Sequence, residues 1–303
     1  MKTFSKIVSL CLVLALFAAM ALGSSSDGGE TKDIVTGNSQ SANGDSANAE
    51  TPETKVDVTI EEQVLLTWND VTITATEYVS DSIWGDGIKV LIENNGTTDL
   101  GVSCNALIVN NYMVTDLFSS TIAAGKKANE TIYLSSSDLE AAGIENVGQI
   151  EFYFHFYDSS SYTTLHDAEV VTLKTSAYDQ MDTVPNDLGT ELYNKNGIKI
   201  VGKFVDEDSF WGAAVLLYIE NTSDKNVSVS CEDLSVNGFM VTGYLYSTVY
   251  ANKMAMDTIT LLSSDLEENN ITSIDEIELK FRIIESETYK EIDETDPITF
   301  SVK

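Results

Sequence analysis

The chain has 303 residues, and its 48 acidic against 17 basic side chains give a formal net charge of −31. A surface with this charge repels nucleic acid and anionic lipid, so the composition excludes nucleic-acid binding and electrostatic attachment to a membrane. Hydrophobic residues make up 43% of the chain, which is enough for globular domains with cores of their own.

Residues 1–23 have the pattern of an export signal. Two lysines precede an apolar run over residues 7–22, and Ala19-Met20-Ala21 fits the small-x-small cleavage rule. The run is short for a membrane span. We therefore expect an exported protein, extracellular or associated with the cell envelope. We expect the protein to be attached to a membrane only if this signal stays uncleaved.

Residues 24–54 are expected to form a disordered spacer. They are rich in Ser, Gly, Asn, Asp and Thr and show no hydrophobic periodicity, so they bury too little surface to offset the entropy of ordering. The segment resembles the tether that follows the lipid-carrying cysteine of bacterial lipoproteins. Ser24 follows the signal where that cysteine would stand, which argues against a lipid anchor.

The rest of the chain consists of two copies of one unit, over residues 55–176 and 190–303. A polar linker over 177–189 joins the two copies. Equivalent residues stand 127 positions apart, as Cys104 and Cys231 do. Self-similarity at a fixed offset is the signature of repeated structural modules.

Each unit is expected to begin with a β-hairpin, because apolar and polar residues alternate on either side of a turn sequence such as Asn196-Gly197. Further strands are expected over 88–93, 100–109, 130–134, 150–157 and 170–173, and in the second unit over 215–220, 227–236, 258–262, 277–284 and 298–302.

A capping box in each unit predicts one short helix. These sequences are Ser137-x-x-Glu140 and Ser264-x-x-Glu267. The helix should end near Gly143 in the first copy and near Asn270 in the second.

About seven short strands per unit, with turn signals every 8–12 residues, predict an all-β fold. We expect two tandem antiparallel Ig-like β-sandwich domains, each with one short helix. The linker is short, so the domains should sit end to end with limited freedom.

Four sequence stretches carry a resemblance to a known group: LYNKNGIKI at 192–200, IEN at 219–221, VNG at 236–238 and SDLE at 264–267. On these, the chain resembles tandem Ig-like β-sandwich repeats of exported proteins and lipoproteins of Gram-positive, often clostridial, bacteria. The function of that group is largely unknown. The resemblance therefore implies a fold and an exported location, and it carries over no catalytic or binding residue.

The sequence predicts no enzyme, no cofactor and no metal centre. His155 and His166 have Arg282 and Asp293 as their counterparts, so no histidine is duplicated. The cysteines of the repeats are expected to be free, buried and unreactive. The chain also lacks a phosphate-binding glycine loop and a nucleophile elbow.

The best candidate binding feature is an acidic turn, Asp-Ser-x-Trp-Gly, that occurs in both units. Its candidate binding residues are Asp81 and Trp84 in the first copy and Asp208 and Trp211 in the second. An exposed Trp could stack on a sugar or anchor a protein partner, and the acidic side chains suit weak Ca²⁺ binding. Alternatively, each Asp caps its own turn and each Trp closes the end of its sandwich.

We therefore expect a non-enzymatic protein that presents two Ig-like domains for binding a protein or glycan at the cell surface. The alternative is a passive structural stalk. A third hypothesis, an acid-pair hydrolase, requires two carboxylates that converge in a cleft, for example between the two domains.

Overall fold

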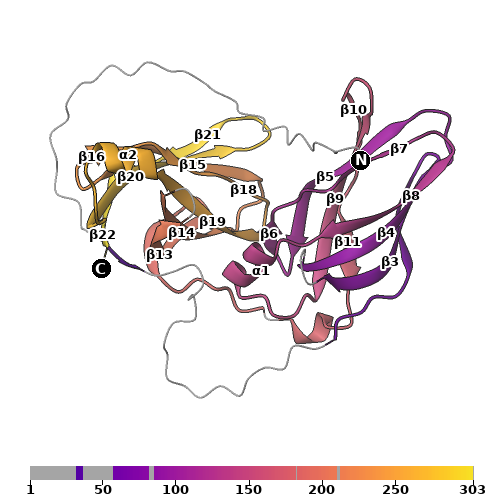
Figure 1. Ribbon diagram of the computed structural model, residues 1–303, viewed down its shortest axis with the longest axis horizontal. Coiled ribbons are helices and arrows are strands. Elements are labelled where there is room, and N and C mark those ends of the chain that lie inside the picture. Colours follow the sequence, from indigo (N-terminus) through magenta and orange to yellow (C-terminus); the bar gives the residue numbers. More distant parts are fainter. Residues whose placement is uncertain (1–31, 37–56, 82–84, 182, 210–211, 303) are drawn as a thin grey trace, which may run out of the picture.

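The computed structural model describes residues 32–36, 57–81, 85–181, 183–209 and 212–302. It contains two β-sandwiches with separate hydrophobic cores, and it confirms the predicted all-β fold with one short α-helix in each repeat (Figure 1). The expected export signal lies outside the described residues. Neither described helix is long and apolar enough to cross a membrane.

The first sandwich packs one antiparallel sheet of four strands against a second sheet. The four-stranded sheet contains β2 (Gln63–Trp68), β3 (Val71–Asp81), β4 (Gly85–Asn94) and β8 (Lys126–Tyr133). The facing strands are β5 (Leu100–Val109), β6 (Tyr112–Val114), β7 (Ser119–Ile122), β9 (Gln149–Asp158), β10 (Thr164–Asp167) and β11 (Val171–Lys174). Alternating side chains such as Ile73, Ile92 and Phe152 point between the sheets and are fully buried.

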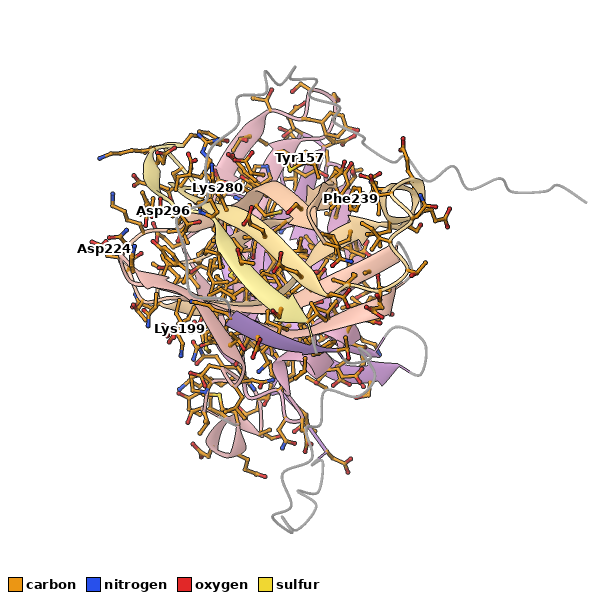
Figure 2. The ribbon with its side chains drawn as sticks, turned by 90° about the vertical axis from the view of Figure 1, so that its left-hand side faces the viewer. Tyr157, Lys199, Asp224, Phe239, Lys280 and Asp296 are labelled. Carbon is orange, nitrogen blue, oxygen red and sulfur yellow. The ribbon has the colours of Figure 1, made fainter. Side chains whose placement is uncertain are left out.

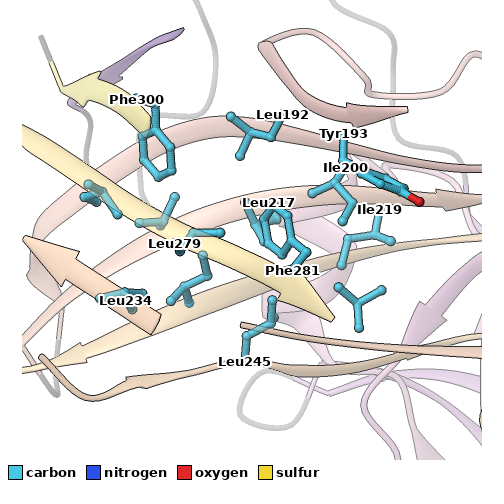
Figure 3. Packing of buried hydrophobic residues seen from close by; sticks show 14 of the residues in the cluster. Leu192, Tyr193, Ile200, Leu217, Ile219, Leu234, Leu245, Leu279, Phe281 and Phe300 are labelled. Carbon is cyan, nitrogen blue, oxygen red and sulfur yellow. The ribbon is translucent and has the colours of Figure 1, made fainter. Parts of the chain in front are cut away.

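The second sandwich repeats this arrangement. One sheet contains β12 (Thr190–Lys195), β13 (Ile198–Ser209), β14 (Gly212–Asn221), β17 (Gly243–Tyr244) and β19 (Lys253–Leu262). The facing strands are β15 (Val227–Val236), β16 (Phe239–Met240), β18 (Tyr246–Val249), β20 (Glu276–Glu285), β21 (Glu291–Glu294) and β22 (Ile298–Val302). Leu217, Leu279 and Phe281 meet between the sheets (Figure 3).

The helices are α1 (Ser136–Ala142) and α2 (Ser263–Glu268), and a 3₁₀ turn over Tyr178–Gln180 begins the linker. The predicted capping boxes are wrong by two residues. Ser135 caps α1, and Leu262 precedes α2 without a side-chain cap. The predicted end of α1 is confirmed, because Gly143 adopts the left-handed conformation at its C-terminus.

In both repeats, a carboxylate in the first turn of the helix fixes the helix to its sandwich. The Asp138 carboxylate accepts a hydrogen bond from the Thr115 backbone N at 2.6 Å, and Asp265 accepts one from Thr242 N at 2.8 Å. The first-turn carboxylate thus binds the chain that follows β6 or β16 rather than the helix itself. This use of the carboxylate explains why the local capping pattern placed the helix start too late.

The expectation of a disordered spacer over 24–54 is wrong for five of its residues. Strand β1 (Lys32–Thr36) belongs to this segment and pairs with the second sandwich. Ile34 is 2% exposed and lies in the core of that sandwich. Composition averaged over the segment hid this one apolar side chain. The remaining residues of 24–54 lie outside the described part of the chain.

Candidate functional site

The structure describes only part of the binding feature predicted from the sequence, the two Asp-Ser-x-Trp-Gly turns. Asp81 is the last residue of β3, and Asp208 lies near the end of β13, each next to the turn that leads into the following strand. Trp84 and Trp211 lie outside the described residues, and the side chains of the two aspartates do too. The binding role of these turns, including weak Ca²⁺ binding, stays a prediction.

The glycine of each acidic turn has a structural role. Gly85 has a φ of +81°, and a Cβ added to it would lie 2.0 Å from Oγ of Ser136, at the start of α1. Gly212 has a φ of +140°, and its added Cβ would lie 2.2 Å from the carbonyl oxygen of Leu261. Each glycine therefore lies close to residues at the start of its own helix, against a side chain in the first repeat and against backbone in the second, and its positive φ favours glycine.

The two sandwiches are joined by strand pairing as well as by the linker. Strand β6 of the first repeat runs parallel to the start of β19 in the second, with Tyr112 opposite Met254 and Met113 opposite Ala255. The Met254 backbone N donates to the carbonyl oxygen of Asn111 at 3.0 Å. In Figure 1, β6 and α1 lie in the middle of the molecule, between the two sandwiches.

A buried ion pair crosses the same junction. Nζ of Lys253 lies 2.6 Å from the carboxylate of Glu151, and these side chains are only 13% and 7% exposed. The same ammonium group donates to Oδ1 of Asn111 at 3.1 Å. Charges at this depth are stabilised only by partners of this kind, so the pair fixes how the repeats dock.

An apolar cluster completes the junction. It contains Tyr112 and Ala142 from the first repeat and Val201 and Tyr218 from the second. The Tyr112 hydroxyl accepts a hydrogen bond from the backbone N of Asn186 in the linker at 2.8 Å. Burial raises the pKa of the Tyr218 hydroxyl well above its usual value, so it stays neutral.

Beside this cluster lies a cavity of about 690 Å³ between the repeats. Its walls come from β6 and α1 on one side and from β13, β14, β18 and β19 on the other. The apolar part of the lining is Met113, Val114, Ala141, Phe204, Ala214, Leu216, Ala255 and Met256, and the hydroxyl part is Thr115, Ser137, Ser209, Ser247, Thr248, Thr258 and Thr260.

The charged lining of the cavity is entirely acidic. Asp138 and Glu140 come from the first repeat, and Asp206 and Asp257 from the second, whereas none of the described lining residues is Lys, Arg or His. Burial raises the pKa of the Asp257 carboxyl, and the nearby Asp138 raises it further. The described residues contain no group of three His, Cys, Asp or Glu side chains arranged to hold a metal ion.

The second of the two Asp-Ser-x-Trp-Gly turns borders this cavity. Ser209, which directly follows Asp208 on β13, and Asp206, two residues before it, contribute to the lining, whereas no described residue of β3 or β4 does. The structure thus brings the second copy of the motif to the junction and does not place the first copy there.

The cavity itself was missed in the sequence, although a signal for it exists. Phe204 and Leu216 are opposite each other in the second repeat, and their counterparts 127 positions earlier are Glu77 and Lys89. An exposed charged pair in one copy and an apolar pair in the other indicate that the second face is covered.

The two histidines and the cysteines of the repeats do not line this cavity. Nδ1 of His155 is 2.6 Å from the carboxylate of Asp167, and His166 stacks on Trp68 with ring centroids 4.9 Å apart. Cys104 and Cys231 are free, as predicted, and are partly buried. Burial raises the pKa of the Cys231 thiol to about 11, which disfavours the reactive thiolate.

Comparisons with known proteins show no family. No family model and no curated protein matches the chain. Among solved structures, the complex of the SafA pilin with the SafB chaperone of Salmonella enterica is 12% identical, with 78% of this chain and 98% of that chain covered and a TM-score of 0.24. The YadV chaperone is 15% identical, with 77% and 100% covered and a TM-score of 0.25.

An exo-chitosanase from Amycolatopsis orientalis is 13% identical, with 72% of this chain and 26% of that chain covered and a TM-score of 0.24. At these scores, none of the three carries an argument about function. The functional argument rests on this chain's own residues.

Proposed function

We propose that the protein is an exported, non-enzymatic binding protein whose ligand site is the cavity between its two sandwiches. One observation carries the proposal: both repeats line a cavity of about 690 Å³, and its described lining residues combine apolar side chains with four carboxyl groups and include no basic side chain. This volume lies within the usual range for ligand sites. The exported location is supported by the signal-like residues 1–23.

The lining favours a ligand with a positive charge beside an apolar body. Phe204, Leu216 and Met256 offer contact to apolar groups, while Glu140 and Asp206 offer negative charge nearby. Lys or Arg side chains in an extended segment of a protein partner have this combination. A neutral glycan fits less well, because Phe204 is the one aromatic side chain among the described lining residues and is 9% exposed.

Calorimetric titration of the full-length chain with a library of basic peptides tests the proposal. Glu140→Lys reverses one charge on the cavity wall and should weaken binding about tenfold or more, which corresponds to about 1.4 kcal/mol. Its matched control is Glu267→Lys, because Glu267 is the equivalent residue on α2 and does not line the cavity.

Equal effects of the two substitutions would show that only the overall charge matters and would remove the cavity from the proposal. Binding of a neutral glycan in place of basic peptides would change the ligand class. A chain that binds neither would leave the passive stalk as the better description.

A second candidate is the acid-pair hydrolase, because the cavity brings Asp138 and Asp257 together from different repeats. Burial raises the pKa of Asp257, as a general acid requires. Hydrolysis of aryl glycosides by the intact chain, lost in Asp257→Asn but retained in Glu267→Gln, would favour this candidate over a binding protein.

A further inference from the structure

The second sandwich is completed by a strand from the far end of the chain. Strand β1 runs parallel to β22, with Asp33 opposite Ser301, and then parallel to β13, with Val35 opposite Phe204. It therefore crosses from one sheet to the other and closes the edge between them. In Figure 2 this indigo strand lies next to the yellow C-terminal strands.

One side chain of β1 is part of the core. Ile34 is 2% exposed, and a Cβ added to Gly202 would lie 2.1 Å from its Cδ1 atom. The counterpart of Gly202 in the first repeat is Ala75, which is fully buried. The second repeat thus lacks a methyl group at the position where the isoleucine enters.

Polar contacts hold the two residues of β1 that precede Ile34. Nζ of Lys32 donates to the carbonyl oxygen of Leu192 at 3.1 Å and also to that of Glu191. The Thr190 hydroxyl donates to the carbonyl oxygen of Asp33. These contacts and the strand pairing define a slot that recognises an extended segment with a β-branched residue at its centre.

The first repeat fills the equivalent edge with its own adjacent segment. The Ser176 backbone N donates to the carbonyl oxygen of Thr59 at 2.9 Å, and Thr59 N donates to Oγ of Ser176 at 2.9 Å. Val58 and Ile60 on either side pack against the first core. This segment directly precedes β2, so no remote strand is needed.

In the second repeat the equivalent segment, residues 184–189, is held elsewhere. Asn186 donates to the hydroxyl of Tyr112 and to the carbonyl oxygen of Ala141, both in the first repeat. Val184 and Leu188 are 74% and 81% exposed, so neither fills the second core. Asn186 also accepts hydrogen bonds from Nζ of Lys203 in the second repeat, so the linker segment bridges the two repeats and leaves the slot to another strand.

We propose that this slot is a strand-acceptor site and that β1 of a second copy of the chain fills it when copies exchange their N-terminal segments. The contacts made by β1 are the same whether it comes from its own chain or from another copy. Residues 37–56 separate β1 from the first sandwich, and at about 3.3–3.6 Å per residue they reach on the order of 70 Å. This reach allows β1 to leave its own slot for that of a neighbour.

Because β1 and its slot belong to one chain, pairing within a chain does not depend on protein concentration, whereas exchange between copies does. Dilute protein therefore keeps the strand in its own chain. Crowding of copies on a surface, or folding of several copies together, favours exchange.

Disulfide capture between separately substituted copies tests the proposal. One copy carries Asp33→Cys and the other Ser301→Cys, at opposed positions of β1 and β22. Residues opposed on paired strands are close enough for a disulfide. After the two full-length chains are unfolded and refolded together at high concentration, a non-reducing gel should show a covalent dimer.

Two controls make the result decisive. Adding Ile34→Asp to the Asp33→Cys copy should reduce dimer formation about tenfold or more, because the strand loses its buried contact. Replacing the acceptor by Ser176→Cys places the thiol at the equivalent, already filled edge of the first repeat and should give no dimer above background.

The proposal is overturned if a chain with both Asp33→Cys and Ser301→Cys forms its internal disulfide while the mixture of single variants never forms a dimer. Equal dimer formation with Ser301→Cys and Ser176→Cys would also overturn it, because it would show random collision. Retention of the internal disulfide reports that the substituted chain still folds.

Discussion

The two copies of the unit differ on the outer face of the hairpin formed by β3 and β4 in the first repeat and by β13 and β14 in the second. In the first repeat, Glu77 and Lys89 stand opposite each other and form an exposed ion pair at 2.7 Å. In the second, the same positions hold Phe204 and Leu216, which line the cavity at the junction with the first repeat. The copies therefore kept one fold and diverged where one of them docks onto the other.

A second difference follows from this docking. The first repeat closes its N-terminal edge with the segment that directly precedes it, whereas the second uses β1 from beyond the first repeat. The linker segment that would have closed the second edge instead binds Tyr112 of the first repeat. The tandem arrangement is thus asymmetric, although its sequence is a simple duplication.

The largest expected effect comes from the buried ion pair at the junction. Lys253→Met leaves the Glu151 carboxylate buried without its cationic partner and should lower the free energy of unfolding by about 3–5 kcal/mol. Lys126→Met changes the equivalent, exposed lysine of the first repeat and should cost less than about 0.5 kcal/mol. Urea unfolding of both variants measures the difference, and equal losses would contradict a special role of the junction.

Shortening Ile34 should have the next largest effect. Ile34→Ala removes buried methyl groups from the second core and should cost about 2–5 kcal/mol, although the residue lies in a segment of spacer-like composition. Val35 is 58% exposed, so Val35→Ala should change stability by less than about 0.5 kcal/mol. Thermal unfolding of the two variants compares them, and a neutral Ile34→Ala would show that β1 is not part of the core.

Gly202→Ala should have a smaller effect that depends on Ile34. The added Cβ forces the isoleucine to move, at a cost of about 1–3 kcal/mol. In the Ile34→Val background the cost should fall, since Cδ1 is the atom that the new Cβ meets. A double-mutant cycle measures this coupling. Additive losses would mean that the two residues do not meet.

The smallest effect concerns pH. Burial raises the pKa of Asp257, so the folded chain holds this proton to higher pH than the unfolded chain. Stability is therefore lost as pH rises from the usual Asp pKa of about 4 to the raised value. Asp257→Asn should remove this loss, and the midpoint of thermal unfolding measured against pH would show it.

Asp187 serves as a control, because its pKa is shifted in the opposite direction from that of Asp257. A hydrogen bond from Lys199 lowers the pKa of its carboxyl. Its contribution to stability is present above the usual Asp pKa and is lost as pH falls through the lowered value. Asp187→Asn should therefore reduce the loss of stability at acidic pH. The same slope in both variants would contradict the assigned pKa directions.

The sequence by itself determined the duplicated unit and most of its strands. Alternating residues such as those of β3, and turn residues such as Asn196 and Gly197, act through local backbone geometry, which a sequence displays directly. The Asp-Ser-x-Trp-Gly motif was visible for the same reason, and the structure gives its glycine a packing role.

Only the tertiary structure decided how the repeats meet and which strand completes the second. The pairing of β6 with β19 and the entry of Ile34 beside Gly202 join residues that are far apart in the chain. Such contacts depend on how two folded units dock, and a five-residue strand with one buried side chain leaves no periodic pattern. The cavity at the junction exists for the same physical reason.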